Sequence, residues 1–276
     1  MINLTRTKYI QNTFSRAAKN YDVYSEMHRS LARRIMTMIP ADREYARILD
    51  VGQGTGWMTH KIKRRHPHAQ VVGMDLAPGM VQLAREKYEE LSIVQARAEQ
   101  LPFKTNSFDL VTSNLVYQWL DNLDEAFKLI HSVLKEQGVI CLAVFGQQTL
   151  SELFDSLIQS CHEDRRAQMA QRVTDLQRLP NRETVRAALV SAGFCQIEFN
   201  EFILKMNFEN MFSVLKWVKA IGANALERNF YLGRDQLFKA DEYYRKQYSH
   251  HGGVCASFEV FVVRAQSEER LRSLQQ

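Results

Sequence analysis

Hydrophobic and polar positions follow two alternating patterns in the first half of the chain. Short apolar runs, typical of strands buried on both faces, are separated by stretches in which apolar residues recur every three or four positions, as in helices. The runs predict strands at residues 48–51, 70–74, 91–95, 108–113 and 138–145, with helices between them, as at 80–90 and 124–134. Strands that alternate with helices form parallel sheets covered on both faces, so we predict a Rossmann-like, doubly wound α/β fold.

The second half of the chain departs from this alternation. Residues 149–173 predict one or two helices, 182–192 another helix, and 208–247 a mostly helical segment between two late strands at 196–206 and 256–265. We expect these strands to add an antiparallel edge hairpin to the mostly parallel sheet. We expect residues 207–250 to be a helical lid and residues 1–40 a helical cap. No repeat or flexible linker divides the chain, so 1–276 is predicted to be one domain.

A glycine-rich loop follows the first predicted strand. Gly52, Gly54 and Gly56 come directly after Val51, and without a Cβ they let the chain turn sharply and bring bare backbone against a ligand. Asp75 ends the second strand about twenty residues later, where a carboxylate can accept hydrogen bonds from both hydroxyls of a ribose. Together these residues predict a nucleoside pocket at the ends of the first two strands.

The spacing of the glycines favours S-adenosylmethionine as the nucleoside cofactor. Dinucleotide-binding loops have the pattern G-x-G-x-x-G, whereas this loop is G-x-G-x-G and has Trp57 where the last dinucleotide glycine would fall. A nicotinamide-dependent dehydrogenase is therefore the least favoured interpretation.

Composition is that of a soluble enzyme. The 276 residues are 45% hydrophobic, enough for a full core, and no apolar run approaches the roughly 18 residues that span a bilayer. The first residues lack the apolar centre of a secretory signal. The four cysteines lie far apart without a C-x-x-C pair, which indicates reduced thiols in a cytoplasmic protein and no zinc site. We expect no membrane contact and no metal.

The net charge of +5 includes a basic run at 61–65 and arginine pairs at 33–34 and 165–166. One interpretation is a set of solvated helix faces. The other is a docking surface for an acidic protein or an anionic substrate, because complementary charge speeds encounter. Nucleic acid is not an expected partner, since no basic stripe is interleaved with stacking aromatics.

Several segments carry a resemblance to a known family. Residues 50–56 (DVGQGTG), 74–80 (MDLAPGM), 98–103 (AEQLPF) and 106–110 (NSFDL) resemble the class I S-adenosylmethionine-dependent methyltransferases. Within that class the chain is similar to the malonyl-acyl-carrier-protein O-methyltransferases of biotin synthesis. The segments that carry this narrower resemblance are 14–22 (FSRAAKNYD), 113–119 (SNLVYQW), 145–153 (FGQQTLSEL), 219–224 (KAIGAN) and 256–260 (ASFEV). The similarity covers nearly the whole chain.

The resemblance implies a set of cofactor-binding residues. They are Asp50, Gly52, Gln53, Gly54, Gly56, Asp75, Leu76, Met80, Ala98, Glu99, Asn114 and Leu115. Asp50 and the loop backbone would face the methionine part, and Asp75 the ribose. Leu76 and Met80 would frame the adenine, with Ala98 and Glu99 near its edge. Asn114 and Leu115 would lie beside the sulfonium, and Tyr21 would close over the cofactor and aim the methyl group. Ordinary core packing is the alternative for Leu76 and Met80, and helix packing for Tyr21.

Two positions depart from the family pattern. Relatives often carry a small residue or cysteine at position 53 and an acid at position 97, where this chain has Gln53 and Arg97. Gln53 can still turn outward, because the loop works mainly through its backbone. A guanidinium cannot accept a hydrogen bond from the adenine amine, so we expect that contact to be lost or supplied by Glu99, with weaker cofactor affinity.

The reaction that the resemblance implies is methyl transfer to the free carboxylate of a malonyl thioester, an early step of biotin synthesis. The thioester would be carried by an acyl carrier protein or by coenzyme A. A carboxylate is ionised at pH 7 and needs no general base, so no catalytic dyad is expected, and rate would come from alignment and exclusion of water. Two alternatives stay open: another small-molecule acceptor, or a non-methylating relative such as a protein-arginine hydroxylase assembly factor, which Arg97 mildly favours.

Overall fold

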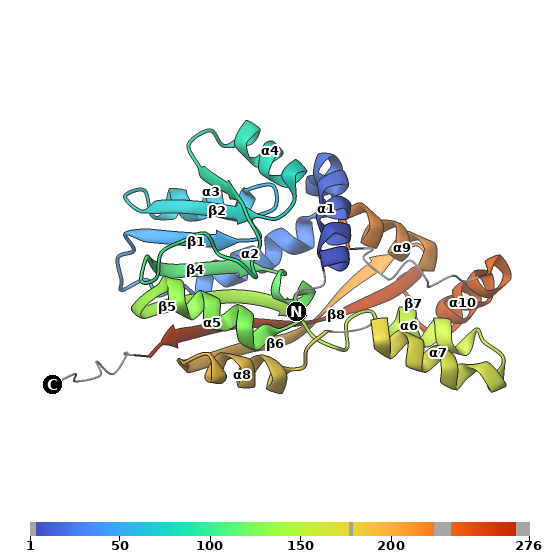
Figure 1. The fold of residues 1–276 in the computed structure, drawn as a ribbon. Coiled ribbons are helices and arrows are strands. Elements are labelled where there is room, and N and C mark those ends of the chain that lie inside the picture. Colours follow the sequence, from blue (N-terminus) through green and yellow to red (C-terminus); the bar gives the residue numbers. More distant parts are fainter. Residues whose placement is uncertain (1–3, 177–178, 224–232, 269–276) are drawn as a thin grey trace.

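The centre of the molecule is one eight-stranded sheet (Figure 1). The structure, a computed structural model, describes residues 4–176, 179–223 and 233–268. Five strands are parallel to one another: β1 (Arg47–Val51), β2 (Gln70–Asp75), β3 (Ser92–Gln95), β4 (Phe108–Asn114) and β5 (Leu134–Phe145). Their order, β3-β2-β1-β4-β5, confirms the predicted doubly wound sheet. The strand order reverses at β1, and in such sheets ligands bind beside the carboxyl ends of the strands at this point.

The C-terminal strands are β6 (Phe194–Phe208), β7 (Ser249–His250) and β8 (Gly253–Ser267). The long strand β8 pairs antiparallel with both β5 and β6, and β7 pairs with β8. The antiparallel addition to the parallel sheet is therefore confirmed, with β6 as the edge strand and β8 inserted between β5 and β6. Because β8 is covered on both faces, it is apolar and buried over most of its length.

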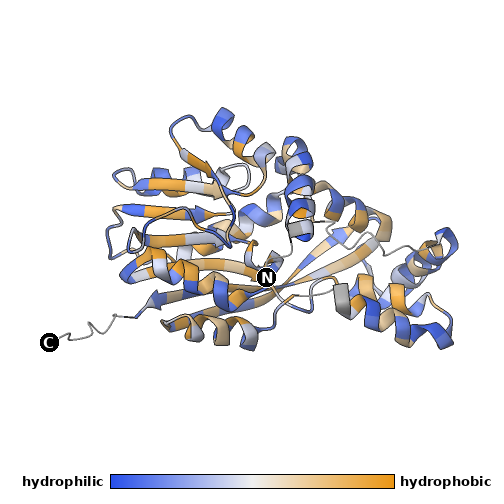
Figure 2. Cartoon of the chain, in the orientation of Figure 1, coloured by the Kyte–Doolittle hydropathy of each residue, from blue (hydrophilic) through white to orange (hydrophobic). Residues whose placement is uncertain are grey.

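Helices cover both faces of the sheet. They are α1 (Leu4–Tyr24), α2 (Glu26–Met38), α3 (Trp57–Arg65), α4 (Pro78–Lys87), α5 (Leu123–Val133), α6 (Ser151–Gln159), α7 (Glu163–Leu176), α8 (Arg182–Ser191), α9 (Met211–Ala220) and α10 (Arg234–Gln247), with a short 3₁₀ turn η1 (Tyr117–Trp119). Leu31 of α2 and Ile62 of α3 belong to the core on one face, and Ile130 of α5 and Val185 of α8 to the core on the other. Figure 2 shows the apolar residues gathered in the strands and the polar ones on the outer helix surfaces.

Helix α1 lies near the carboxyl ends of the parallel strands, next to α4 and α9 (Figure 1). The Trp217 indole nitrogen on α9 donates to the Tyr24 carbonyl oxygen at 3.2 Å, which ties α9 to the end of α1. The predicted cap 1–40 corresponds to α1 and α2. The predicted lid 207–250 contains α9, α10 and β7, while its residues 224–232 lie outside the described residues. Within the described ranges, no helix is long and apolar enough to cross a membrane.

Candidate functional site

The glycine loop after β1 turns sharply enough to expose its backbone. Gly52, Gly54 and Gly56 have φ of +69°, +58° and +85°, a region that side chains make costly. The backbone N–H groups of Gly52 and Gln53 both donate to the Met74 carbonyl oxygen, at 2.7 and 3.0 Å. These bonds hold the start of the loop against the end of β2, so the rest of the loop projects beyond the sheet.

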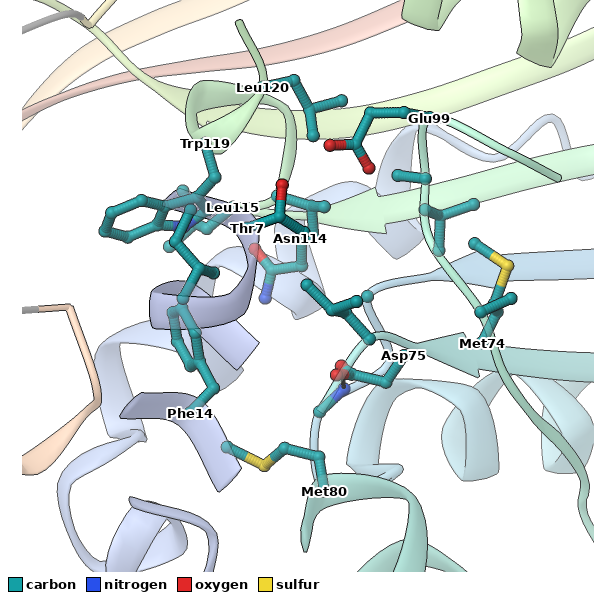
Figure 3. A pocket seen from close by; sticks show the side chains of 18 of the residues that line it. Thr7, Phe14, Met74, Asp75, Met80, Glu99, Asn114, Leu115, Trp119 and Leu120 are labelled. Atoms are coloured by element: carbon teal, nitrogen blue, oxygen red, sulfur yellow. Dashed lines mark hydrogen bonds between the residues drawn. The ribbon is translucent and has the colours of Figure 1, made fainter. Parts of the chain in front are cut away.

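A cavity opens between this loop, α1 and the ends of β1, β2 and β4 (Figure 3). The residues that the sequence predicted and that line it are Tyr21, Gly52, Gly54, Asp75, Leu76, Met80, Ala98, Glu99, Asn114 and Leu115. We call it the first cavity. Its wall is bare at Gly54, since a Cβ built there meets only the Tyr21 ring, at 4.0 Å. The structure thus brings most of the predicted site residues together around open space.

Asp75 presents its carboxylate to the first cavity (Figure 3). One oxygen accepts the Ala77 backbone N–H at 2.8 Å and the other accepts the Gly54 N–H at 2.9 Å. Burial raises the pKa of Asp75, while these backbone hydrogen bonds act in the opposite direction. A carboxylate oxygen can accept more than one hydrogen bond, so both oxygens keep acceptor capacity for a pair of adjacent hydroxyls.

Asp50 and Gly56 are among the predicted site residues, yet neither lines a described cavity. Asp50 is fully buried behind the loop, where its carboxylate accepts hydrogen bonds from the hydroxyls of Thr59 at 2.6 Å and Thr112 at 3.0 Å. Burial raises the pKa of Asp50 to about 7, although both hydroxyls lower it. Gly56 is the N-cap residue just before α3, and a Cβ there would lie 3.0 Å from the Tyr88 ring. Asp50 therefore supports the loop from behind, and Gly56 permits close packing.

A second cavity continues from the first along α2. It shares Tyr21, Gly52, Gly54 and Asn114 with the first, and these four residues form the junction between the cavities. The residues that only the second cavity has are Asp22, Ser25, His28, Arg29, Ala32, Gln53, Thr55, Trp57 and Met58. Of these, the sequence predicted Gln53 alone. Three of the others, His28, Arg29 and Ala32, come from α2, which had no motif to mark it; the rest come from the end of α1 and the residue after it, the glycine loop and the start of α3.

Polar atoms without partners gather around the second cavity. Among the described residues, His28 Nδ1, Arg29 Nε, Asn114 Oδ1 and both amide atoms of Gln53 are buried without a hydrogen bond. Burial lowers the pKa of His28 to about 4, so its ring is neutral at pH 7. The Asn114 side-chain nitrogen donates to the His28 carbonyl oxygen at 2.8 Å, which fixes the two residues against each other. Buried polar atoms are nearly always hydrogen-bonded, so this cluster indicates a polar ligand.

Gln53 corrects one expectation. It does not turn outward: the residue is only 6% exposed, and a Cβ on Gly73 would lie 1.8 Å from Gln53 Oε1. The side chain therefore lies in space that a glycine in β2 leaves free, and its amide lines the second cavity. The prediction of an outward Gln53 was wrong because the space that Gly73 leaves could not be inferred from the loop sequence.

Arg97 lies beside the first cavity and not in its lining. Its guanidinium donates to the Thr7 hydroxyl at 3.3 Å and lies 3.8 Å from the Glu99 carboxylate. Arg97 thus ties α1 to the segment after β3. Glu99 does line the cavity, as the sequence predicted, and its contact with an adenine amine stays a prediction.

Helix α1 contributes a wall of which only Tyr21 was predicted from the sequence. Thr7, Ile10, Phe14 and Tyr21 recur at helical spacing and all line the first cavity. Phe14 packs edge to face on Trp119 of η1, with ring centroids 5.6 Å apart, and the pair closes one side of the cavity (Figure 3). The spacing marks a helix face, but the same pattern is typical of core packing. No group of three or more potential metal ligands is found among the described residues.

Comparisons with known proteins agree with this geometry. The family model described as a methyltransferase domain matches residues 49–142, from β1 into β5. The malonyl-[acyl-carrier protein] O-methyltransferase of Geobacter sulfurreducens is 36% identical over 78% of this chain and 80% of its own length. The protein of the same name from Gallionella capsiferriformans is 32% identical over 79% and 75%.

Solved structures show the same fold. The YcgJ protein of Bacillus subtilis superimposes with a TM-score of 0.60 at 18% identity, over 88% of this chain and all of that one. Phosphoethanolamine N-methyltransferase 2 of Haemonchus contortus, solved in complex with S-adenosyl-L-methionine, gives a TM-score of 0.58 at 18% identity, over 92% of this chain and 57% of that one.

Proposed function

Because this chain belongs to the malonyl-[acyl-carrier protein] O-methyltransferase family of class I methyltransferases, we propose that its methyl acceptor is the free carboxylate of a malonyl thioester. The protein is an S-adenosylmethionine-dependent methyltransferase. The observation that carries the substrate assignment is the match to relatives of that name over most of both chains. We place the reaction early in biotin synthesis, with an acyl carrier protein as partner.

The residues of the first cavity fit the adenosine of the cofactor. Asp75 would accept hydrogen bonds from the ribose hydroxyls, and the open space above Gly54 leaves room for the sugar. Leu76 and Met80 would contact the adenine, with Ala98 and Glu99 near its edge. When bound, S-adenosylmethionine supplies a methyl group on a positively charged sulfur.

The second cavity fits the amino-acid end of the cofactor. It offers the neutral amide of Gln53 and the cation of Arg29 beside the loop backbone. Arg29 also lies 3.6 Å from Asp22, so part of its charge is already paired, and its unpartnered Nε is free for an incoming carboxylate. A charge-assisted hydrogen bond of this kind contributes about 1.5–3 kcal/mol.

The junction between the cavities suits an acceptor that arrives already ionised. Tyr21 lies there with a raised pKa, because it is buried near Asp75 and Asp22. The neighbouring His28, with a pKa of about 4, is a weak base. Neither can efficiently take a proton from a phenol or an ammonium group, whereas a malonyl carboxylate needs no proton removed. The Tyr21 hydroxyl and Asn114 are the groups that we expect to position the acceptor.

The test is a direct assay of methyl transfer. Purified protein is given S-adenosylmethionine with malonyl-acyl carrier protein, malonyl-coenzyme A, or a panel of phenols and amines, and release of S-adenosylhomocysteine is measured with mass analysis of the acceptor. We expect a mass gain of one methyl group on the malonyl thioesters and none on the panel. Turnover of a panel compound with no malonyl product would overturn the assignment. Rescue of a biotin-requiring strain that lacks this step provides the test in cells.

A further inference from the structure

Positive charge is concentrated on two neighbouring helices. Helix α2 carries Arg29, Arg33 and Arg34, and its one acidic residue is Glu26. Helix α3, which packs beside α2, carries four basic residues and no acidic one. The set called the basic face below consists of the exposed Arg33, Arg34, Arg64 and Arg65 together with the half-buried Lys61.

Little of this charge is neutralised within the protein. On α2, Glu26 pairs with Arg33 at 2.9 Å and lies 3.9 Å from Arg29, which also pairs with Asp22. Among the ion pairs of the described residues, none joins Arg34, Lys61, Arg64 or Arg65 to a carboxylate. Favourable contact with the helix dipole accounts for cations in the last turn of α3. It does not account for Arg33 or Lys61, and like charges one turn apart destabilise a helix.

The basic face adjoins the second cavity through Trp57. The Arg33 guanidinium lies 5.4 Å and the Lys61 ammonium 5.7 Å from the centre of the Trp57 ring. Trp57 itself lines the second cavity, as does Arg29, which precedes Arg33 by one helical turn. A molecule held on this face is therefore beside the second cavity, which meets the first at the junction where we expect the acceptor.

We propose that the basic face docks an acidic protein, the acyl carrier that presents the malonyl thioester. The charges are spread over two helices and do not converge on one point, which matches a broad acidic surface and not a small anion. The inference rests on the proposed function, because it assigns the surface that would receive the carrier. Rim charges of this kind act mainly on encounter and on its salt dependence.

The experiment compares two charge reversals of equal size. Lys61→Glu/Arg64→Glu alters the basic face, and Lys128→Glu/Arg186→Glu alters exposed cations on α5 and α8, over the other face of the sheet. Each variant is assayed with malonyl-acyl carrier protein and with malonyl-pantetheine, which has no protein surface. We expect kcat/KM for the carrier substrate to fall at least tenfold in the basic-face variant alone, mainly through KM. The values for malonyl-pantetheine should stay unchanged in both variants.

Binding of fluorescently labelled malonyl-acyl carrier protein, followed by anisotropy, separates docking from chemistry. Loss of binding in the basic-face variant and retention in the control support docking even if no methyl transfer occurs, in which case the proposed function fails instead. Equal losses in both variants, an equal loss with malonyl-pantetheine, or wild-type protein that does not bind the carrier would overturn docking. Thermal unfolding checks that each variant folds. If the basic-face variant Lys61→Glu/Arg64→Glu does not fold, Lys61→Gln/Arg64→Gln is used in its place.

Discussion

The two sides of the glycine loop use the same residue type for opposite purposes. In front of the loop, Asp75 is held by backbone N–H groups and keeps acceptor capacity toward the first cavity. Behind it, Asp50 is enclosed and receives hydroxyl hydrogen bonds from Thr59 and Thr112. The difference lies in what surrounds each carboxylate. The front of the loop faces open space and the back is packed against α3 and β4, so changes on the two sides should have separable effects.

The largest expected effect is on the front side. Asp75→Ala removes the acceptor for two ribose hydroxyls, each worth about 1.5–3 kcal/mol, so affinity for S-adenosylmethionine should fall on the order of 10³-fold in calorimetry. Asp109→Ala is the matched control. Its carboxylate also accepts two backbone N–H groups, at 2.9 and 2.7 Å, but does not line either cavity. The control should lose stability and keep affinity, and undiminished affinity in Asp75→Ala would falsify the assigned site.

Behind the loop, Asp50 should make the free energy of unfolding depend on pH. The folded-state pKa of Asp50 is raised to about 7 from 3.8, so the folded protein holds an extra proton between those values. The protonated Asp50 side chain therefore stabilises the folded state at low pH, and this stabilisation is lost as the pH rises toward 7. Between pH 5 and 7 this amounts to roughly 2 kcal/mol of unfolding free energy.

Asp50→Asn removes this titration. Urea unfolding of both proteins at pH 5, 6 and 7 should show the stability of the wild type falling relative to the variant by that amount. Parallel curves would mean that Asp50 has no raised pKa. Because Asp50 lines neither cavity, we expect affinity for the cofactor to change less than in Asp75→Ala.

The residues in front of the loop could be predicted from the sequence because the patterns that mark them are local. Strand, glycine loop and distant aspartate each leave a short signature, and Gly52, Gly54 and Asp75 lie together as expected. Which side a residue faces is not local. Asp50 and Gln53 belong to the same motif, yet hydroxyls from α3 and β4 enclose the first, and a glycine in β2 makes room for the second.

The same reason limits prediction in the second half of the chain. The late strands β6 and β8 were predicted from alternation and apolar content, but the insertion of β8 between β5 and β6 depends on pairing between distant segments. The lid is a further case. No described residue of 207–250 lines either cavity, so closure of that segment stays a prediction. Apart from Tyr21 and its segment 14–22, the cavity walls from α1 and α2 had only an amphipathic pattern, which ordinary core packing also produces.

Substitutions at two glycines test the difference between the two sides of the loop further, with an expected effect of intermediate size. Gly54 and Gly252 have φ of +58° and +79°, so alanine at either costs about 1–2 kcal/mol of stability. Only Gly54 borders the first cavity, and a Cβ at Gly252 meets nothing within 4 Å. We expect Gly54→Ala to weaken binding of S-adenosylmethionine about tenfold, the equivalent of about 1.4 kcal/mol, and Gly252→Ala to leave it unchanged. If the two variants lose the same stability and bind S-adenosylmethionine with the same affinity, the front of the loop does not contact the ligand.

The smallest expected effect on cofactor affinity concerns Arg97, which lies beside the first cavity at a position where relatives often carry an acid. Its guanidinium is engaged by Thr7 and lies near Glu99, and it offers no acceptor to an adenine amine. Arg97→Asp supplies one, and a net hydrogen bond of about 0.5–1 kcal/mol strengthens calorimetric affinity roughly threefold. Arg97→Ala removes the cation without adding an acceptor and should gain less. An equal gain in both variants would mean that the cation itself opposes binding, and no gain in either would mean that Glu99 already makes the contact.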